Sequence, residues 1–175
     1  MRTFVTLAVL LILASAPLGH AHSPPEEPPK GVSVITGGEL PTYHVWRTVL
    51  HALGSGDPDA PRVERAIPVS DAHREIILTY ARKNAAAEQA NRERQQKALD
   101  AMLAAGVKQN SRALREALAQ IDYEHRIETM RTRDDLLAAL PEEARYAFES
   151  WVENWRQNIR YFVTPRDLDL FLRQP

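Results

Sequence analysis

The sequence predicts an all-α fold: a helical bundle built on a long antiparallel helical hairpin, with a short C-terminal helix and an extended proline-rich N-terminal tail. Two observations lead to this prediction. Apolar residues recur at gaps of three and four along most of the chain after Pro41, which is the period of an amphipathic helix. The residues that interrupt helices stand between these segments, at Gly54, Gly106 and Pro141.

The first helix is expected from Pro41 to Leu53, because proline suits the first turn of a helix and Gly54 follows its last apolar residue. Its buried stripe is Tyr43, Trp46, Leu50 and Leu53. The segment from Gly54 to Arg62 carries glycines, prolines and aspartates and is predicted to be a loop.

The two helices of the hairpin follow. Ser70 is a suitable N-cap, and no helix-breaking residue occurs until Gly106. Asn110 or Ser111 caps the next helix, which runs to about Leu140. Because a short turn joins two long helices, they are expected to pack antiparallel.

The middle of the longer helix, residues 82–97, contains only alanine among apolar residues. Two interpretations stay open: packing through small alanine contacts, or exposure to water. The stretch Ala85–Ala90 could also form the contact of a homodimer. Charged pairs such as Glu88 with Arg92 are interpreted as part of a solvated face.

The segment from Pro141 to Phe162 is predicted to be the central core helix, since two of the three tryptophans lie on its apolar stripe. That stripe consists of Phe148, Trp151, Val152, Trp155, Ile159 and Phe162. Thr164 to Asp167 resembles a capping box and opens the short last helix.

The N-terminal residues 1–21 are predicted to be a signal peptide, with Arg2, an apolar run and small residues before a cut after Ala21. The apolar run is too short to span a bilayer, which takes about 20 residues. The mature protein is therefore expected in the periplasm or secreted, without a transmembrane segment. Residues 22–39 form the tail and residues 40–175 a single helical domain; the β-like run Val32–Ile35 either pairs at an edge or lies as an extended strap.

Composition excludes several functions. Loss of Arg2 leaves 21 Lys and Arg against 23 Asp and Glu, a balance that argues against nucleic-acid binding. The chain has no cysteine, which excludes disulfides, thiol catalysis and thiolate metal sites. Serine-nucleophile motifs, glycine-rich phosphate loops and His-Glu-x-x-His are absent from the sequence, so we expect no enzyme and no cofactor.

Cleavage after Ala21 would place His22 at the N-terminus, where its α-amine and ring nitrogen could chelate copper or zinc. This N-terminus resembles that of lytic polysaccharide monooxygenases and of some periplasmic copper carriers. The resemblance covers one residue, and since those proteins are β-sandwiches it implies the chelate and not their activity.

Four further side chains are candidate metal ligands by spacing. Two histidines seven residues apart share one side of the first helix, and an aspartate and a histidine three apart on the third helix can reach one ligand. These residues are His44, His51, Asp122 and His125. The alternative is an ordinary structural role at the edge of the core.

The leading functional hypothesis is a non-catalytic binding or chaperone-like interaction protein with a protein partner. The long polar helix and the lack of catalytic motifs favour it. Leu140 to Phe148 is similar to the Leu-Thr-x-x-Gln region of small periplasmic stress chaperones and metal-resistance proteins, but Pro141 and Ala144 replace the threonine and glutamine. The alternative hypothesis is a periplasmic copper- or zinc-binding protein that uses His22.

The signal-peptide prediction is checked by native mass spectrometry of untagged protein from its own export compartment. We expect a mass that begins at His22. An added mass of copper or zinc would favour the metal-binding alternative, whereas a metal-free mass would favour the interaction protein. A mass that begins elsewhere would remove the N-terminal chelate.

Overall fold

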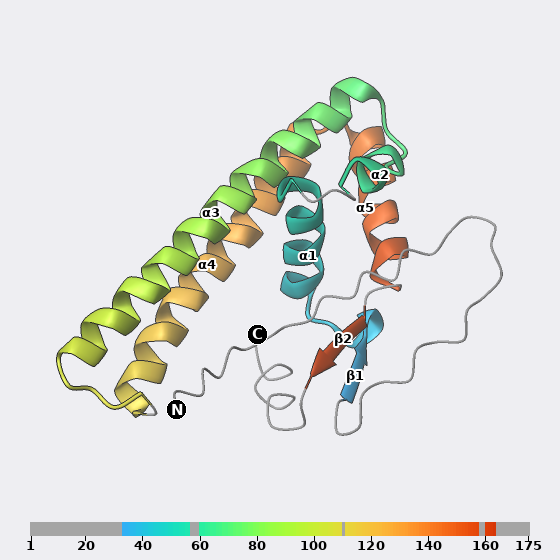
Figure 1. Ribbon diagram of the computed structural model, residues 1–175. Helices are drawn as coiled ribbons and strands as arrows, with labels where there is room; N and C mark the ends of the chain where they lie inside the picture. Colours follow the sequence, from blue (N-terminus) through green and yellow to red (C-terminus); the bar gives the residue numbers. More distant parts are fainter. Residues whose placement is uncertain (1–32, 57–59, 110, 158–159, 164–175) are drawn as a thin grey trace. The chain divides into compact units, whose positions relative to one another are not determined.

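A computed structural model describes residues 33–56, 60–109, 111–157 and 160–163 (Figure 1). The chain divides into two compact units. One unit is Trp46–Trp151, and the other combines Met1–Val45 with Val152–Pro175. The predicted signal peptide and most of the predicted tail lie outside the described residues, as does the predicted last helix.

The unit Trp46–Trp151 is built on the helical hairpin that the sequence predicts. Helices α3 (Asp71–Ala104) and α4 (Arg112–Ala139) lie side by side and antiparallel (Figure 1). Both predicted caps are confirmed, because the Ser70 hydroxyl accepts from the His73 amide at 3.3 Å and the Ser111 hydroxyl accepts from the Leu114 amide at 3.2 Å. Gly106 adopts a φ of 82° in the turn between them, a conformation that glycine reaches without strain.

The predicted first helix is confirmed as α1 (Thr42–Gly54), a helix shared between the two units. A short helix, α2 (Ala60–Arg65), follows it. The loop predicted for Gly54–Arg62 therefore extends too far, because α2 already begins at Ala60. Pro61 stands in the first turn of α2, where a missing amide donor costs no hydrogen bond.

The predicted core helix ends earlier than expected. Helix α5 covers Glu142–Arg156, and β2 (Arg160–Val163) follows it. β2 pairs antiparallel with β1 (Ser33–Thr36), with Ile35 opposite Tyr161, and the 3-10 turn Gly37–Glu39 follows β1. The prediction that the helix continues to Phe162 was thus wrong. The aromatic and β-branched residues of β2 favour a strand when a partner strand is present. The β-like run near Val34 pairs with another strand, so the alternative of an unpaired extended strap was wrong.

The apolar core of the unit Trp46–Trp151 joins α1 to α5. The rings of Trp46 and Phe148 meet edge-on at 5.8 Å between centroids, and Phe148 stacks on Trp151 at 5.9 Å. The largest fully buried apolar side chains around them come from α1, α3, α4 and the loop before α3: Val49, Leu50, Ile67, Ile77 and Leu136. The predicted stripe of α1 is confirmed as core. Of the predicted stripe of α5, Phe148 and Val152 are buried, whereas Trp151 and Trp155 are partly exposed. The fold class is all-α with one two-stranded addition.

Within the described residues, none of the helices combines the length and the apolar character needed to cross a membrane.

Gly54 offers a test of the packing between α1 and α3. A Cβ at this position would lie 2.2 Å from the Ala81 carbonyl oxygen, which belongs to rigid helix backbone. We expect Gly54→Ala to lower the free energy of unfolding by about 3 kcal/mol, since overpacking of this kind forces the backbone apart. Urea denaturation followed by tryptophan fluorescence measures the change.

Gly38→Ala is the matched control, because no atom lies within 4 Å of a Cβ there. We expect it to change the unfolding free energy by less than about 0.5 kcal/mol. Equal stability of the Gly54 and Gly38 variants would contradict the close approach of α1 to α3.

Candidate functional site

The middle of the α3–α4 hairpin buries polar side chains where a helical hairpin ordinarily buries apolar ones. On α3 the buried stripe that starts at Ile77 and Ala81 continues through polar residues at the same alternating spacing of three and four. On α4 the buried positions between Leu114 and Leu136 are polar as well. We call these residues the polar seam: Asn84, Glu88 and Asn91 of α3, with His125, Thr129 and Thr132 of α4.

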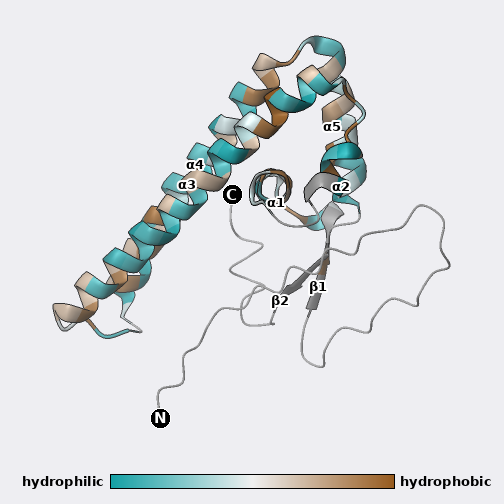
Figure 2. Cartoon of the chain, turned by 45° about the horizontal axis from the view of Figure 1, so that its top comes forward, coloured by the Kyte–Doolittle hydropathy of each residue, from teal (hydrophilic) through white to brown (hydrophobic). Residues whose placement is uncertain are grey.

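Residues 82–97 are mostly exposed to water, as the second interpretation has it, but the polar seam is an exception to it. The buried positions there are held by polar side chains, while Ala86 and Ala90 are exposed to water. Hydrophilic residues accordingly colour much of the length of α3 and α4 (Figure 2). The middle of α3 is therefore mostly in water, with one buried polar stripe, and is not packed mainly through alanines.

Glu88 is the central charge of the seam, with its side chain 5% exposed. Its Oε1 accepts from Arg47 Nη2 at 2.8 Å, and its Oε2 lies 2.9 Å from His51 Nδ1, so two side chains of α1 hold one carboxylate of α3. Arg92 Nη1, one turn along α3, lies 3.5 Å from the same Oε1. These four residues form what we call the Glu88 cluster.

The surroundings of Glu88 fix its ionisation. Burial by itself raises the pKa of this carboxyl, but the hydrogen bonds and charges of His51 and Arg47 outweigh burial and lower the pKa to about 2. Glu88 thus remains a carboxylate at any ordinary pH. A carboxylate so acidic is a poor general base near neutrality, so the cluster is suited to holding helices together and not to proton transfer.

The interpretation of Glu88 and Arg92 as a solvated surface pair was wrong. Arg92 is half exposed, but Glu88 faces α1 and lies inside the hairpin. The signal was present in the sequence, because positions 77, 81, 84, 88 and 91 keep one helix face in register. This stripe does not stand out in the sequence, because a charged residue such as Glu88 is usually taken to end a buried face.

His125 is the most enclosed ionisable group of α4, with 1% of its surface exposed. Within the described part of the chain, neither ring nitrogen has a hydrogen-bond partner. Burial lowers the pKa of His125, the positive charge of Arg47 acts in the same direction, and Glu88, Glu128 and Asp122 oppose them. The ring is therefore held in its neutral form.

The predicted metal ligands occupy separate environments. His44 is buried in α1 with its ring 5.0 Å from that of Tyr43, and Asp122 accepts from Arg126 at 2.6 Å. His51 binds Glu88, a residue that no sequence motif marks as part of a site. Among the described residues, no group of three or more His, Asp or Glu side chains is arranged to hold a metal ion. His22 lies outside the described residues, so its chelate stays a prediction.

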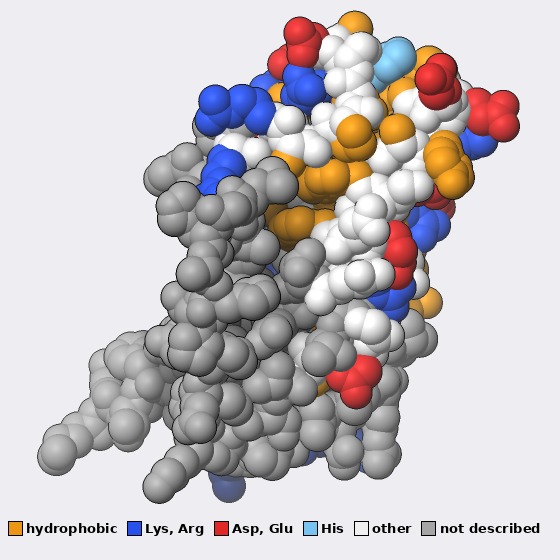
Figure 3. All heavy atoms as spheres, turned by 90° about the vertical axis from the view of Figure 1, so that its right-hand side faces the viewer, with side chains coloured by type: hydrophobic (Ala, Val, Ile, Leu, Met, Phe, Trp, Pro, Cys, Tyr) orange, Lys and Arg blue, Asp and Glu red, His pale blue; other side chains and the backbone are white. Residues whose placement is uncertain are grey.

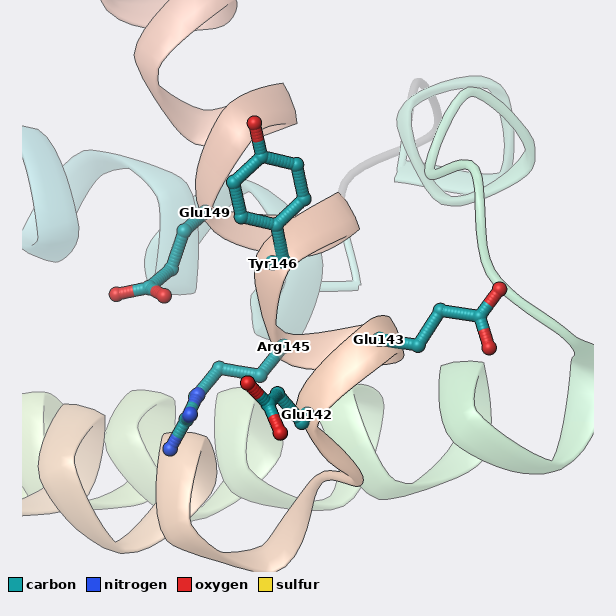
Figure 4. Close-up of a pocket in the computed structure, with 5 residues that line it drawn as sticks. All are labelled: Glu142, Glu143, Arg145, Tyr146 and Glu149. Atoms are coloured by element: carbon teal, nitrogen blue, oxygen red, sulfur yellow. The ribbon is translucent and has the colours of Figure 1, made fainter.

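A hollow of about 510 Å³ lies on the surface of α5. Its lining side chains all come from this helix and point in different directions, as Figure 4 shows. They are Glu142, Glu143, Arg145, Tyr146 and Glu149. Because the polar groups do not converge on a common point, the hollow lacks the arrangement of a small-molecule site.

Comparison of the sequence with protein-family models, with curated proteins and with solved structures finds no match.

Removal of the Glu88 charge tests the cluster. Glu88→Gln leaves Arg47 and His51 of α1 without their carboxylate partner, and we expect it to lower the free energy of unfolding by about 1–3 kcal/mol at pH 7. Urea denaturation gives this value. The matched control is Glu93→Gln on the exposed side of α3, with an expected change below about 0.5 kcal/mol.

The same variant has a distinct pH dependence. Because the pKa of Glu88 is about 2 in the folded protein against an ordinary 4.5, its contribution is complete above pH 4.5 and is lost as the pH falls toward 2. The wild type should therefore lose more stability than Glu88→Gln across this window. Parallel stability profiles would contradict a buried, cation-held carboxylate.

Proposed function

We propose that the protein is an exported, non-catalytic helical binding protein with chaperone-like activity toward other proteins of the periplasm or the secreted space. The observation that supports this most is the outer surface of the hairpin. With 34 residues in α3 and 28 in α4, and about 1.5 Å of rise per residue, the helices are about 51 and 42 Å long. Such a surface is long enough to contact an extended stretch of another chain.

The outer surface of α4 carries exposed apolar side chains among charges. Tyr123 is 52% exposed and Ile127 is 42% exposed, and their spacing of four places them on one face of the helix. Glu124 and Arg131 are exposed on the same helix. The face drawn in Figure 3 also has apolar side chains lying among charged and other polar ones. A mixed surface of this kind suits weak contacts with unfolded chains of varied sequence.

The chemistry of the described residues favours binding over catalysis. The Glu88 carboxylate is held by cations, and the side chains around the α5 hollow diverge. Neither feature provides a positioned nucleophile or a base with a pKa near neutrality. Binding through the hairpin surface is the function that these features support best.

A reduction assay tests the proposal directly. Insulin treated with dithiothreitol releases a chain that aggregates, and light scattering follows the aggregation. Because this protein has no cysteine, the reductant leaves its own structure unchanged. We expect the mature protein to suppress scattering at near-stoichiometric ratios. Failure to do so, together with no captured partner from its own compartment, would refute the proposed function.

The double variant Tyr123→Gln with Ile127→Gln locates the binding surface. Loss of the two partly exposed side chains removes about 1.4 kcal/mol of apolar contact, so we expect about tenfold weaker suppression of aggregation. Tyr146→Gln is the control, since this tyrosine is 74% exposed on α5 and outside the hairpin. Equal loss in both variants would show that suppression does not depend on the hairpin surface.

A further inference from the structure

The polar seam contains more hydrogen-bonding groups than its contacts satisfy. Within the described residues, both side-chain atoms of the Asn84 amide, the Thr129 hydroxyl and both ring nitrogens of His125 lack partners, and all three side chains are at least 99% buried. A buried polar group without a partner loses its bonds to water and gains nothing in return. These residues therefore hold α3 and α4 together less strongly than buried apolar side chains such as Ile77 and Leu136 do.

His125 is the seam residue that can change charge. The charged groups that act on it come from each of the three helices around it: Arg47 of α1, Glu88 of α3, and Asp122 and Glu128 of α4. Glu88 is already bound by Arg47 and His51, and Asp122 by Arg126. Glu128 is exposed at the surface. A protonated ring would carry a positive charge into a site that is 1% exposed and lies within reach of the Arg47 charge, and both effects oppose the charged form.

We propose that the α3–α4 hairpin is an acid-responsive device, in which uptake of a proton by the buried His125 ring separates the two helices along the polar seam. The proton comes from water and binds one ring nitrogen, and the resulting cation gains hydration only when the seam opens. Asn84 and Thr129 gain water partners in the same movement. Opening then exposes seam surface that the closed hairpin covers.

The direction of the pH effect follows from the linkage between protonation and opening. In the closed hairpin burial holds the pKa of His125 below its ordinary 6.5, whereas in the open hairpin the hydrated ring regains that value. The free energy of opening is therefore highest above pH 6.5, and it decreases as the pH falls toward the lowered pKa of His125. Uptake of one proton lets the opening equilibrium grow by at most about tenfold for each pH unit below 6.5.

Hydrogen exchange of the full mature chain, read by mass spectrometry at pH 7.5 and pH 5.0, tests the proposal. Rates are corrected for the intrinsic effect of pH on amide exchange. We expect peptides covering 84–91 and 125–132 to exchange up to about thirtyfold faster at pH 5.0, since opening then takes up one proton. Peptides from the rest of α1 and α5 should keep their protection.

Two variants separate His125 from other titrating groups. His125→Leu and His125→Gln cannot take up the proton, so their corrected exchange rates should be the same at both pH values. His73→Gln, a change in the first turn of α3, is the matched histidine control and should respond as the wild type does. Equal acid response in the wild type and in a folded His125 variant would overturn the proposal.

If neither His125 variant folds, the wild-type protein still tests whether protonation of His125 opens the seam. An NMR titration of the His125 ring should show a neutral ring that gains its proton together with the loss of seam protection. A ring that titrates at its ordinary pKa while the seam stays protected would overturn the proposal. Because no client protein enters these measurements, the acid response and the proposed binding function can fail separately.

Discussion

The contact between the Glu88 carboxylate and the Arg47 and His51 side chains of α1 is the constraint on which the arrangement of the unit Trp46–Trp151 depends. The middle of the hairpin has no large apolar side chain from α3 to hold it, so the Glu88 cluster takes over that part of the packing. A buried carboxylate is stable only with close partners of opposite charge and with its lone pairs satisfied. Arg47 supplies the opposite charge and His51 a second hydrogen bond, because α1 lies against α3 near Gly54, where no side chain separates the helices.

Such a cluster contributes more to specificity than to stability. Burying an ion pair costs desolvation that its attraction barely offsets, and apolar residues of similar volume often pack as well or better. A single polar position in a helical seam, however, disfavours every register in which it meets an apolar residue. In this hairpin Glu88 meets α1 only when α3 has the observed rotation. The polar seam therefore defines which face of α3 is inside, a choice that the alanine-rich composition of the segment leaves open.

The helices could be predicted from the sequence because their signals are local. Ser70, Ser111, Gly54 and Gly106 act within one turn of the chain, and each marks a helix end in the structure. The end of α5 could not be predicted in the same way. Tyr161 and Phe162 fit a helical stripe by spacing, and only the distant strand β1 makes a strand the better choice.

The candidate site depends even more on contacts between distant residues. Sequence spacing singled out His51 and His125, but it paired His51 with His44 and His125 with Asp122, and neither with Glu88. The partner of His51 lies 37 residues away, and nothing local to either residue indicates the contact. Likewise, the burial of His125 depends on the polar face of α3, which resembles a solvated face in composition. A periodic stripe shows which residues share a face, but not whether that face is covered.

The two buried ionisable groups of the hairpin differ in the pH at which they respond, and the difference gives the acid response a direction. Proton uptake linked to His125 begins below its ordinary pKa of 6.5, whereas Glu88 keeps its charge down to a pKa of about 2. Between pH 6.5 and pH 2 the Glu88 carboxylate still binds α1 to α3. In the same range the closed form of the seam between α3 and α4 becomes less favoured relative to the open form. Helix α4 is thus the element that moves, because it shares the seam with α3 but contributes no cation to the Glu88 cluster among the described residues. The order of the two titrations therefore favours a partial opening at mildly acidic pH, in which the Glu88 carboxylate still joins α1 to α3.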